Sequence, residues 1–164
     1  MNTKKITILL SMVIFACASL TAQDFKYIGA AKCKMCHNKP NKGEQFKVWS
    51  AGPHAKAMES LNAEEAKDPK CLKCHSTVGH IDAGLVAGIK VEEGVSCETC
   101  HGPGSAYKGA SVMKNREMSM EKGLIIPDEA LCKTCHNEES PDFKGFDYAE
   151  YTAKIAHPDP TLAQ

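Results

Sequence analysis

The sequence predicts a mainly α-helical fold with extensive irregular loops. Good helix formers occupy 54–61, directly after Pro53, and proline is favoured at the first position of a helix. Glycines punctuate 79–94, and 102–104 (Gly-Pro-Gly) forces a turn. Aromatic residues make up only 6% of the chain, whereas 9 of its 164 residues are cysteine. We therefore expect short helices and long loops around a small side-chain core.

The helix candidates follow the prolines and glycines along the chain. The longest covers 43–66 and is interrupted at 51–53 (Ala-Gly-Pro). Asp128 is expected to begin a helix that leads into the last cysteine pair, and 148–156 is a further helix-like run. The stretch 79–94, which is rich in glycine and β-branched residues, is expected to form a loop or a short hairpin.

The first 22 residues have the pattern of a secretory signal peptide. Lys4 and Lys5 precede an apolar run over 6–20, and small residues follow up to Ala22. The apolar run is too short for a comfortable membrane span. We therefore expect an exported, periplasmic protein whose mature chain, residues 23–164, does not cross the membrane.

Two other ways of processing this end fit the sequence less well. Residues 16–18 (Ala-Cys-Ala) also obey the small-x-small rule, so a cut after Ala18 is an alternative. Cys17 could instead carry a lipid anchor at the start of the mature chain. Phe15, two positions before it, is a poor match to the small residues expected there.

The charge balance argues against one broad class of function. Lys and Arg together number 20, as do Asp and Glu, so the chain has no formal net charge. Loss of Lys4 and Lys5 with the signal peptide would leave a net charge of −2. A strongly basic protein that binds nucleic acid is therefore not expected.

The eight cysteines of the mature chain all lie in four copies of one motif, Cys-x-x-Cys-His. This spacing is the attachment signature of c-type haem. Two thiols add to the two vinyl groups at one edge of the porphyrin, and the adjacent histidine is the proximal ligand of the iron. The expected attachment residues are Cys33, Cys36, Cys71, Cys74, Cys97, Cys100, Cys132 and Cys135, and the expected proximal ligands are His37, His75, His101 and His136.

Other uses of paired cysteines explain this pattern less well. Zinc sites do not require a histidine after every pair. Four disulfides with identical two-residue loops would make a poor framework, and four redox dithiols have no evident use in one small chain. The sequence therefore predicts four covalently attached haem c groups.

Four haems determine what kind of core is possible. They leave about 35 residues of the mature chain for each haem, which is too few for separate domains. We expect one domain, residues 23–164, that forms a compact multihaem cytochrome c wrapped around four stacked haems. The apo chain is not expected to fold, because the haems would supply most of the core.

Three further histidines, His54, His80 and His157, remain for the second axial positions of four irons. Histidine or methionine there closes a haem for electron transfer, whereas an empty position admits small molecules. His54 and His157 are expected to be distal ligands. His80 could ligate an iron or bond to a haem propionate. At least one iron must be open, bound by water, or held by a residue such as Met or Lys.

Methionine is the main non-histidine candidate for that fourth iron. Met113, Met118 and Met120 cluster between the third and fourth motifs. Such a cluster more often packs than ligates, and Met113 is the member considered as a ligand.

Two stretches of the chain resemble the tetrahaem cytochrome c-554 family. They are 49–61, WSAGPHAKAMESL, and 94–104, GVSCETCHGPG. The order of the four motifs and a late histidine also agree, so the resemblance covers nearly all of the mature chain. It implies electron transport in the periplasm through haems stacked in pairs, with three bis-histidine haems and one five-coordinate haem on the second motif.

Residue by residue, the resemblance implies that His54 and His157 are distal ligands and that His75 belongs to the open haem. The sequence departs from the family over 105–120, where a distal histidine is expected and none is present. His80 or Met113 would have to replace that histidine, or a second iron is open.

The expected function is electron transfer between a donor and an acceptor redox protein, which could form part of a membrane-associated redox complex. The alternative is a haem enzyme that reduces a small nitrogen oxide, hydroxylamine or peroxide at an open iron. No catalytic constellation beyond that iron is evident. Lysines around the motifs could form docking patches or could simply be solvated; they are Lys32, Lys34, Lys70, Lys73 and Lys133.

Overall fold

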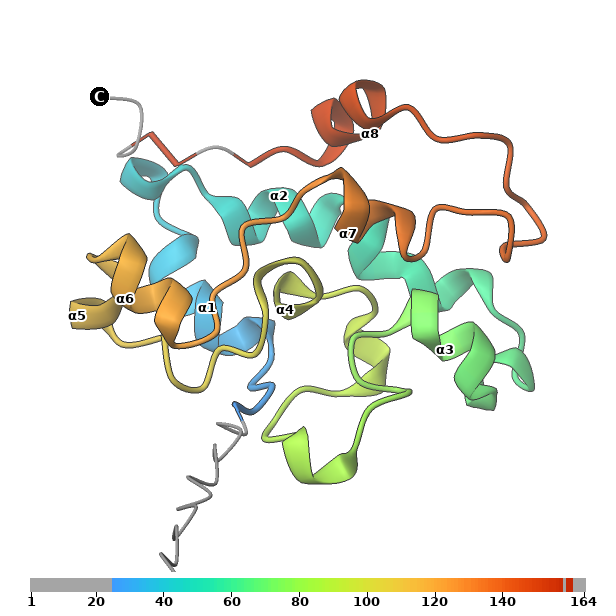
Figure 1. Ribbon diagram of the computed structural model, residues 1–164, viewed down its shortest axis with the longest axis horizontal. Coiled ribbons are helices and arrows are strands. Elements are labelled where there is room, and N and C mark those ends of the chain that lie inside the picture. The colour runs from blue at the N-terminus through green and yellow to red at the C-terminus, as the bar shows by residue number, and fades with distance from the viewer. Residues whose placement is uncertain (1–24, 158, 161–164) are drawn as a thin grey trace, which may run out of the picture.

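A computed structural model describes residues 25–157, 159 and 160 (Figure 1). The expected signal peptide and the alternative at Cys17 lie outside these residues. The described part consists of short helices and irregular loops, so the predicted mainly α-helical class is confirmed. The α-helices are α1 (Ala30–His37), α2 (Gln45–Ala51), α3 (Pro69–His75), α4 (Cys97–His101), α5 (Ala110–Met113), α6 (Arg116–Glu121), α7 (Glu129–Lys133) and α8 (Tyr148–Ile155). The 3-10 helices are η1 (Pro40–Lys42), η2 (His54–Ser60), η3 (Glu65–Lys67), η4 (Ala83–Leu85) and η5 (Val91–Glu93).

The helices surround α4, which lies near the centre of the view in Figure 1. Helices α1, α5 and α6 gather on one side of it, and α3 lies on the other. Helix α8 runs along one edge of the molecule, above α2 and α7. Within the described residues, no helix is long and apolar enough to span a membrane.

Each Cys-x-x-Cys-His motif folds into a helical turn. The first and second motifs end α1 and α3, and the third makes up α4. The fourth begins within α7 and continues as a turn in which His136 N donates to Cys132 O over 3.0 Å. Residues three apart share one face of such a turn, so both thiols of a motif lie on the same side.

Aspartate side chains begin several of these helices. Asp68 accepts a hydrogen bond from Lys70 N at the start of α3, with proline at the first helical position. Asp128 accepts from Leu131 N over 2.9 Å at the start of α7. Such caps bind amide groups that the helix itself leaves without partners. The predicted helix start at Asp128 is confirmed, and the predicted run 148–156 forms α8.

The predicted long helix over 43–66 is broken as expected, but its second half has a different geometry. Helix α2 ends at Ala51, and 54–60 form the 3-10 helix η2 rather than an α-helix. The carbonyl of His54 accepts a hydrogen bond from Val95 N over 3.0 Å. Val95 thus ties the first residue of η2 to the segment that leads into the third motif.

The stretch 79–94 forms a loop with two 3-10 turns, η4 and η5, and not a hairpin. It pairs instead with the start of the described chain. Tyr27 N donates to Leu85 O, and Ala87 N donates to Tyr27 O, each over 2.8 Å. The loop therefore fastens the N-terminal segment to the rest of the fold.

The described part of the chain buries little apolar surface of its own. Its buried apolar side chains are Ile28, Ala30, Leu72, Val78, Ile89 and Tyr107. Buried polar side chains match them in number: Gln45, Ser76, Thr77, Ser96, Glu98 and Ser119. A chain of this size with so small a core needs other groups to complete it.

Candidate functional site

A cavity of about 340 Å³ lies against the first and third motifs. Cys33 and His37 line it from α1, and His101 lines it from α4. Two of the three further histidines, His54 and His157, also reach its wall. The rest of the wall is largely apolar and aromatic, as cofactor pockets generally are; it includes Phe46, Val48, Trp49, Tyr107, Leu124, Ile126 and Ile155.

Two histidine pairs have the spacing of ligands that share one metal ion. The ring centroids of His54 and His136 are 6.1 Å apart, and those of His101 and His157 are 5.9 Å apart. A metal–imidazole bond of about 2 Å, plus about 1 Å from nitrogen to ring centre, gives about 6 Å across a bis-histidine metal. The structure thus brings each expected distal ligand to a proximal histidine of another motif.

The environment of these rings favours the form that binds iron. Burial lowers the pKa of His54, and the nearby His136 lowers it further. Burial also lowers the pKa of His101 and of His136. The neutral imidazole is the metal-binding form of histidine, so these rings would be available as ligands at neutral pH.

Two of the motif histidines are oriented by backbone carbonyls. Nδ1 of His75 donates to Ala57 O over 2.8 Å, and Ser60 Oγ lies 3.2 Å from the same nitrogen. Nδ1 of His101 donates to Ile125 O over 3.3 Å. Metal-binding histidines use their second nitrogen in this way, and the arrangement leaves Nε2 free to face an iron.

Cysteines of different motifs lie next to one another. A hydrogen bond with the thiol of Cys97, together with burial, raises the pKa of Cys33. Burial raises the pKa of Cys74 to about 11, and a hydrogen bond with Cys135 contributes to that shift. The first motif therefore meets the third, and the second meets the fourth.

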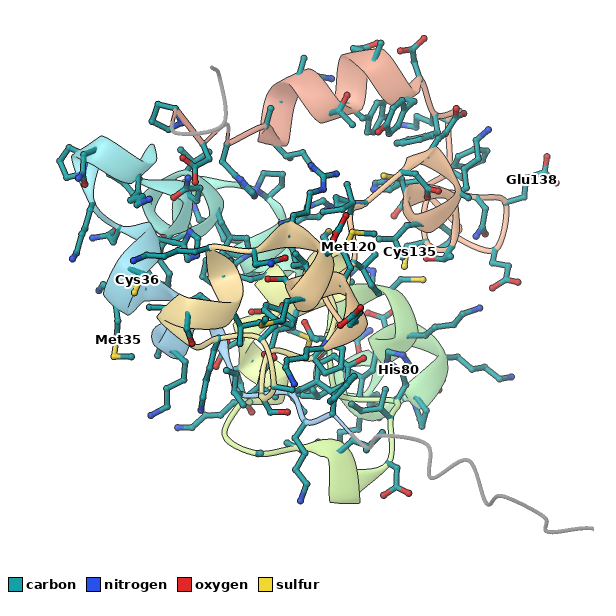
Figure 2. The ribbon with its side chains drawn as sticks, turned by 60° about the vertical axis from the view of Figure 1, so that its left-hand side comes forward. Met35, Cys36, His80, Met120, Cys135 and Glu138 are labelled. Carbon is teal, nitrogen blue, oxygen red and sulfur yellow. The ribbon has the colours of Figure 1, made fainter. Side chains whose placement is uncertain are left out.

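The third and fourth motifs influence one another electrostatically. Burial raises the pKa of Cys100 to about 11, and the electrostatic effects of Cys132 and Cys135 add to the increase. The sulfurs thus connect the motifs in the order first, third, fourth, second. Figure 2 shows Cys36 at the left of the molecule and Cys135 to the right of its centre, so the first and fourth motifs are well separated in that view.

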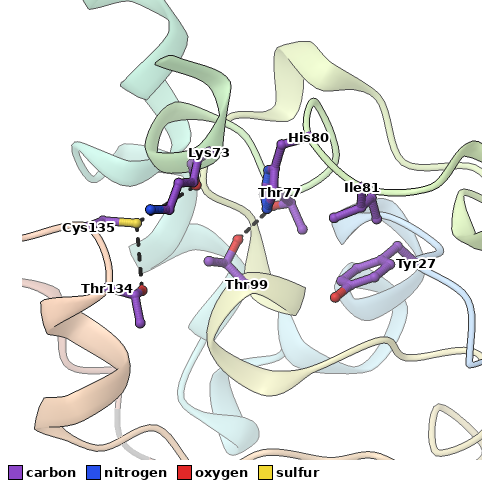
Figure 3. Close-up of a pocket in the computed structure, with 8 residues that line it drawn as sticks. All are labelled: Tyr27, Lys73, Thr77, His80, Ile81, Thr99, Thr134 and Cys135. Atoms are coloured by element: carbon purple, nitrogen blue, oxygen red, sulfur yellow. Dashed lines mark hydrogen bonds between the residues drawn. The ribbon is translucent and has the colours of Figure 1, made fainter. Parts of the chain in front are cut away.

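His80 lies apart from the large cavity. It is exposed and lines a smaller cavity of about 220 Å³ together with Lys73 and Cys135 (Figure 3). Thr77 and Thr99 bridge one side of this cavity through a hydrogen bond of 2.7 Å. The structure places His80 beside the second and fourth motifs, and not beside His37.

Two of the lysines considered for docking are paired with glutamates. Lys73 Nζ lies 3.1 Å from Glu139 Oε2, and Lys133 Nζ lies 2.6 Å from Glu129 Oε1. Such exposed ion pairs contribute little to stability, but they reduce the free positive charge near the second and fourth motifs.

Glu98 is a structural residue of this site that the sequence did not reveal. It is the second residue of the third motif and is only 1% exposed. Its carboxylate accepts hydrogen bonds from Ile28 N at 2.9 Å, Gly29 N at 2.7 Å and Gly104 N at 2.6 Å. The turn over 102–104, which the sequence does predict, brings Gly104 back to this carboxylate.

Tyr107 supports the same motif from outside it. Its hydroxyl donates to His101 O over 3.0 Å and to Gly102 O over 2.8 Å. Burial raises the pKa of Tyr107, and the neighbouring Cys33 and Glu98 add to the increase. The phenol therefore stays protonated and holds the backbone at the end of α4.

The donor set fits haem c. Each motif supplies two free thiols on one face of a helical turn and one histidine. Gln45 adds an orphaned polar atom at the cavity wall, because its side chain is 8% exposed and Oε1 has no hydrogen-bond partner. Within the described part, no group of three or more His, Cys, Asp or Glu side chains could hold a metal ion.

Comparisons with known proteins agree with this site. A family model described as cytochrome c554 and c-prime matches residues 32–102, which contain the first three motifs. The chain is similar to cytochrome c-554 of Nitrosomonas europaea, with 29% identity over 193 aligned positions. That alignment covers 92% of this chain and 78% of the relative. No solved structure gave a significant match.

Proposed function

Because the chain belongs to the cytochrome c-554 family, we propose that it carries electrons in the periplasm through four covalently attached haem c groups. Membership of the family makes it a c-type haem electron-transfer protein with redox partners. The number of haems, their ligands and the periplasmic location belong to the proposal.

The adjacency of cysteines from different motifs is the observation that carries this proposal. Thioether sulfurs sit at the edges of their haems, so neighbouring sulfurs imply neighbouring haem edges. The hydrogen-bonded pairs Cys33–Cys97 and Cys74–Cys135, together with the electrostatic influence of Cys132 on Cys100, then describe one continuous route. Electrons would pass from the first haem to the third, the fourth and the second, or in the reverse order.

The residues of the chain would hold the haems and set their ligation. Bound haem supplies one-electron chemistry at its iron. His136 and His54 would close the iron of the fourth motif, and His101 and His157 that of the third. The carbonyl of Ala57 would fix the ring of His75 on the second motif.

A second candidate function concerns the iron of the second motif. In the described part of the chain, ring contacts join His54 to His136 and His157 to His101, whereas none joins His75 to another imidazole. An open iron at His75 could bind and reduce a small nitrogen oxide, hydroxylamine or peroxide. Such an enzyme would also need a proton donor above that iron.

The proposed function is tested by the haem content and redox behaviour of the exported protein. The full chain would be produced in a host that attaches c-type haem, and the periplasmic fraction collected. The intact mass should correspond to residues 23–164 plus four haems, and all four should accept electrons in a redox titration. A mass with fewer haems, or haems that do not reduce, would contradict the proposal.

The electron route has its own test. Cys74 would be replaced by Ala, which leaves one thioether on the second haem, with Cys71→Ala as a matched control in the same motif. Rapid reduction should slow for the second haem in Cys74→Ala more than in Cys71→Ala, because Cys74, unlike Cys71, is hydrogen-bonded to Cys135 of the fourth motif. Equal effects of the two substitutions would argue against this route.

A further inference from the structure

We propose that Met113 is the second axial ligand of the iron bound by His37, which gives the first haem histidine–methionine ligation. This inference rests on the proposed function, because it requires a haem on the first motif. It assigns a ligand to one of the two irons, those at His37 and His75, that the histidine pairs leave without a second ligand.

The histidines are used elsewhere in the described structure. His54 and His157 lie at ligand spacing from His136 and His101. His80 is exposed and lines the small cavity beside Cys135, away from the cavity that His37 lines. His54 and His157 line the same cavity as His37, but each is paired with the histidine of another motif, and His80 lies outside that cavity.

Met113 is placed to serve the iron at His37. Among the described methionines, Met113 alone lines the large cavity that His37 lines, and no lysine of the described residues lines that cavity. Met118 and Met120 belong to the same cluster in the sequence but lie outside the cavity wall. All three are partly exposed, Met113 at 36%, Met118 at 39% and Met120 at 49%, so it is the position at the cavity that distinguishes Met113. Figures 1 and 2 both show α5 and α6 beside α1, the helix that carries the first motif.

The backbone at Met113 is held firmly. Met113 N donates to Gly109 O over 2.9 Å at the end of α5. The hydroxyl of Ser119, a residue only 1% exposed, donates to Val112 O and to Asn115 O, each over 2.9 Å. A buried serine of α6 thus fixes the chain on both sides of Met113, which is how a supporting residue holds a metal ligand in position.

Gln45 is another side chain at the cavity wall with an oxygen that could ligate an iron. Its Oε1 has no hydrogen-bond partner in the described structure. A carboxamide oxygen is a hard ligand, whereas the thioether of methionine is soft and suits haem iron. The two ligands give different spectra, so one experiment separates them.

Methionine ligation would set the first haem apart from the others. Methionine in place of a second histidine raises the reduction potential of a haem. The first haem would then be the most oxidising of the closed haems, at one end of the route through the sulfurs. It would retain electrons that reach it and would suit an exit toward a high-potential acceptor.

The test uses the haem-loaded, full-length protein and the far-red band that arises from sulfur-to-iron charge transfer in oxidised haems with a methionine ligand. Peptide mass analysis first establishes whether the peptide holding Cys33 and Cys36 carries a haem. The wild-type protein should show one such band. Met113→Leu, which keeps the side-chain volume, should lose it, and Met113→His should lose it while one reduction potential moves downward.

Met118→Ala and Met120→Ala are the matched controls and should keep the band. Absence of the band from wild-type protein that carries haem at Cys33 and Cys36 would overturn the inference and leave the proposed function intact. Survival of the band in Met113→Leu, or its loss in a control variant, would also overturn it.

A first motif without haem would overturn both this inference and the tetrahaem proposal. If the Met113 variants do not fold, the wild-type band together with its retention in both controls supports the inference.

Discussion

Glu98 joins the start of the described chain to the third motif, and its removal should destabilise the protein strongly. The carboxylate is 1% exposed and accepts from three backbone amides, those of Ile28, Gly29 and Gly104. In Glu98→Ala these amides would lose their partner in a place that water does not reach. Each buried amide left without a partner costs about 1–3 kcal/mol, so the three together cost at least about 3 kcal/mol.

That loss is large compared with the stability of an ordinary domain, about 5–15 kcal/mol. Glu98→Gln keeps the size of the side chain and one acceptor oxygen, but its NH₂ group would face a backbone N–H. It should therefore cost less than Glu98→Ala, roughly 1–3 kcal/mol for one amide without a partner.

The assay is guanidinium unfolding of the haem-loaded protein, followed by far-ultraviolet circular dichroism. Glu92→Gln is a suitable control, because Glu92 is exposed and lies six residues earlier in the chain. The guanidinium concentration at the unfolding midpoint should be equal for the wild type and Glu92→Gln. It should be lower for Glu98→Gln and lowest for Glu98→Ala. A free energy of unfolding for Glu98→Ala within about 0.5 kcal/mol of the control, the usual range for surface substitutions, would refute the role given to this carboxylate.

Two further predictions concern the third and fourth motifs. Tyr107→Phe removes the hydrogen bonds to His101 O and Gly102 O and should cost about 1–2 kcal/mol in chemical unfolding. Because burial raises the pKa of Tyr107, its contribution should be complete below the ordinary tyrosine pKa of about 10 and should be lost as the pH rises further. The wild type and Tyr107→Phe should thus converge in stability at alkaline pH, and a difference that grows with pH would contradict the assignment. His54→Ala should open the iron held by His136, seen as a new high-spin signal and new binding of cyanide, whereas His80→Ala should leave the spin states unchanged. An unchanged spectrum of His54→Ala would show that His54 is not a ligand.

The sequence predicts the features that depend on near neighbours. The mainly α-helical class, the helix start at Asp128 and the break before Pro53 all follow from local rules, and the structure confirms them. The structure differs where a distant partner intervenes. The run after Pro53 forms a 3-10 helix, and the carbonyl at its first residue, His54, accepts a hydrogen bond from the distant Val95 N. The stretch 79–94 bonds to Tyr27 instead of pairing with itself.

The same distinction applies to the candidate site. Sequence spacing identifies the four motifs and three further histidines, but it cannot say which rings meet. His54 and His136 lie in different parts of the chain, and only the fold brings their centroids to 6.1 Å. The buried role of Glu98 could not be predicted from the sequence, because two of its three amide partners, at Ile28 and Gly29, lie about seventy residues earlier.

Low-temperature electron paramagnetic resonance of the oxidised, haem-loaded protein, with and without nitric oxide, would test the haem arrangement most directly. The account predicts three low-spin irons per chain. Their ligand pairs would be His136 with His54, His101 with His157, and His37 with Met113. The iron at His75 should give one high-spin signal that disappears when nitric oxide binds. Four low-spin irons that do not respond to nitric oxide would contradict the open second haem. High-spin signals from two or more irons would contradict the ligand pairs.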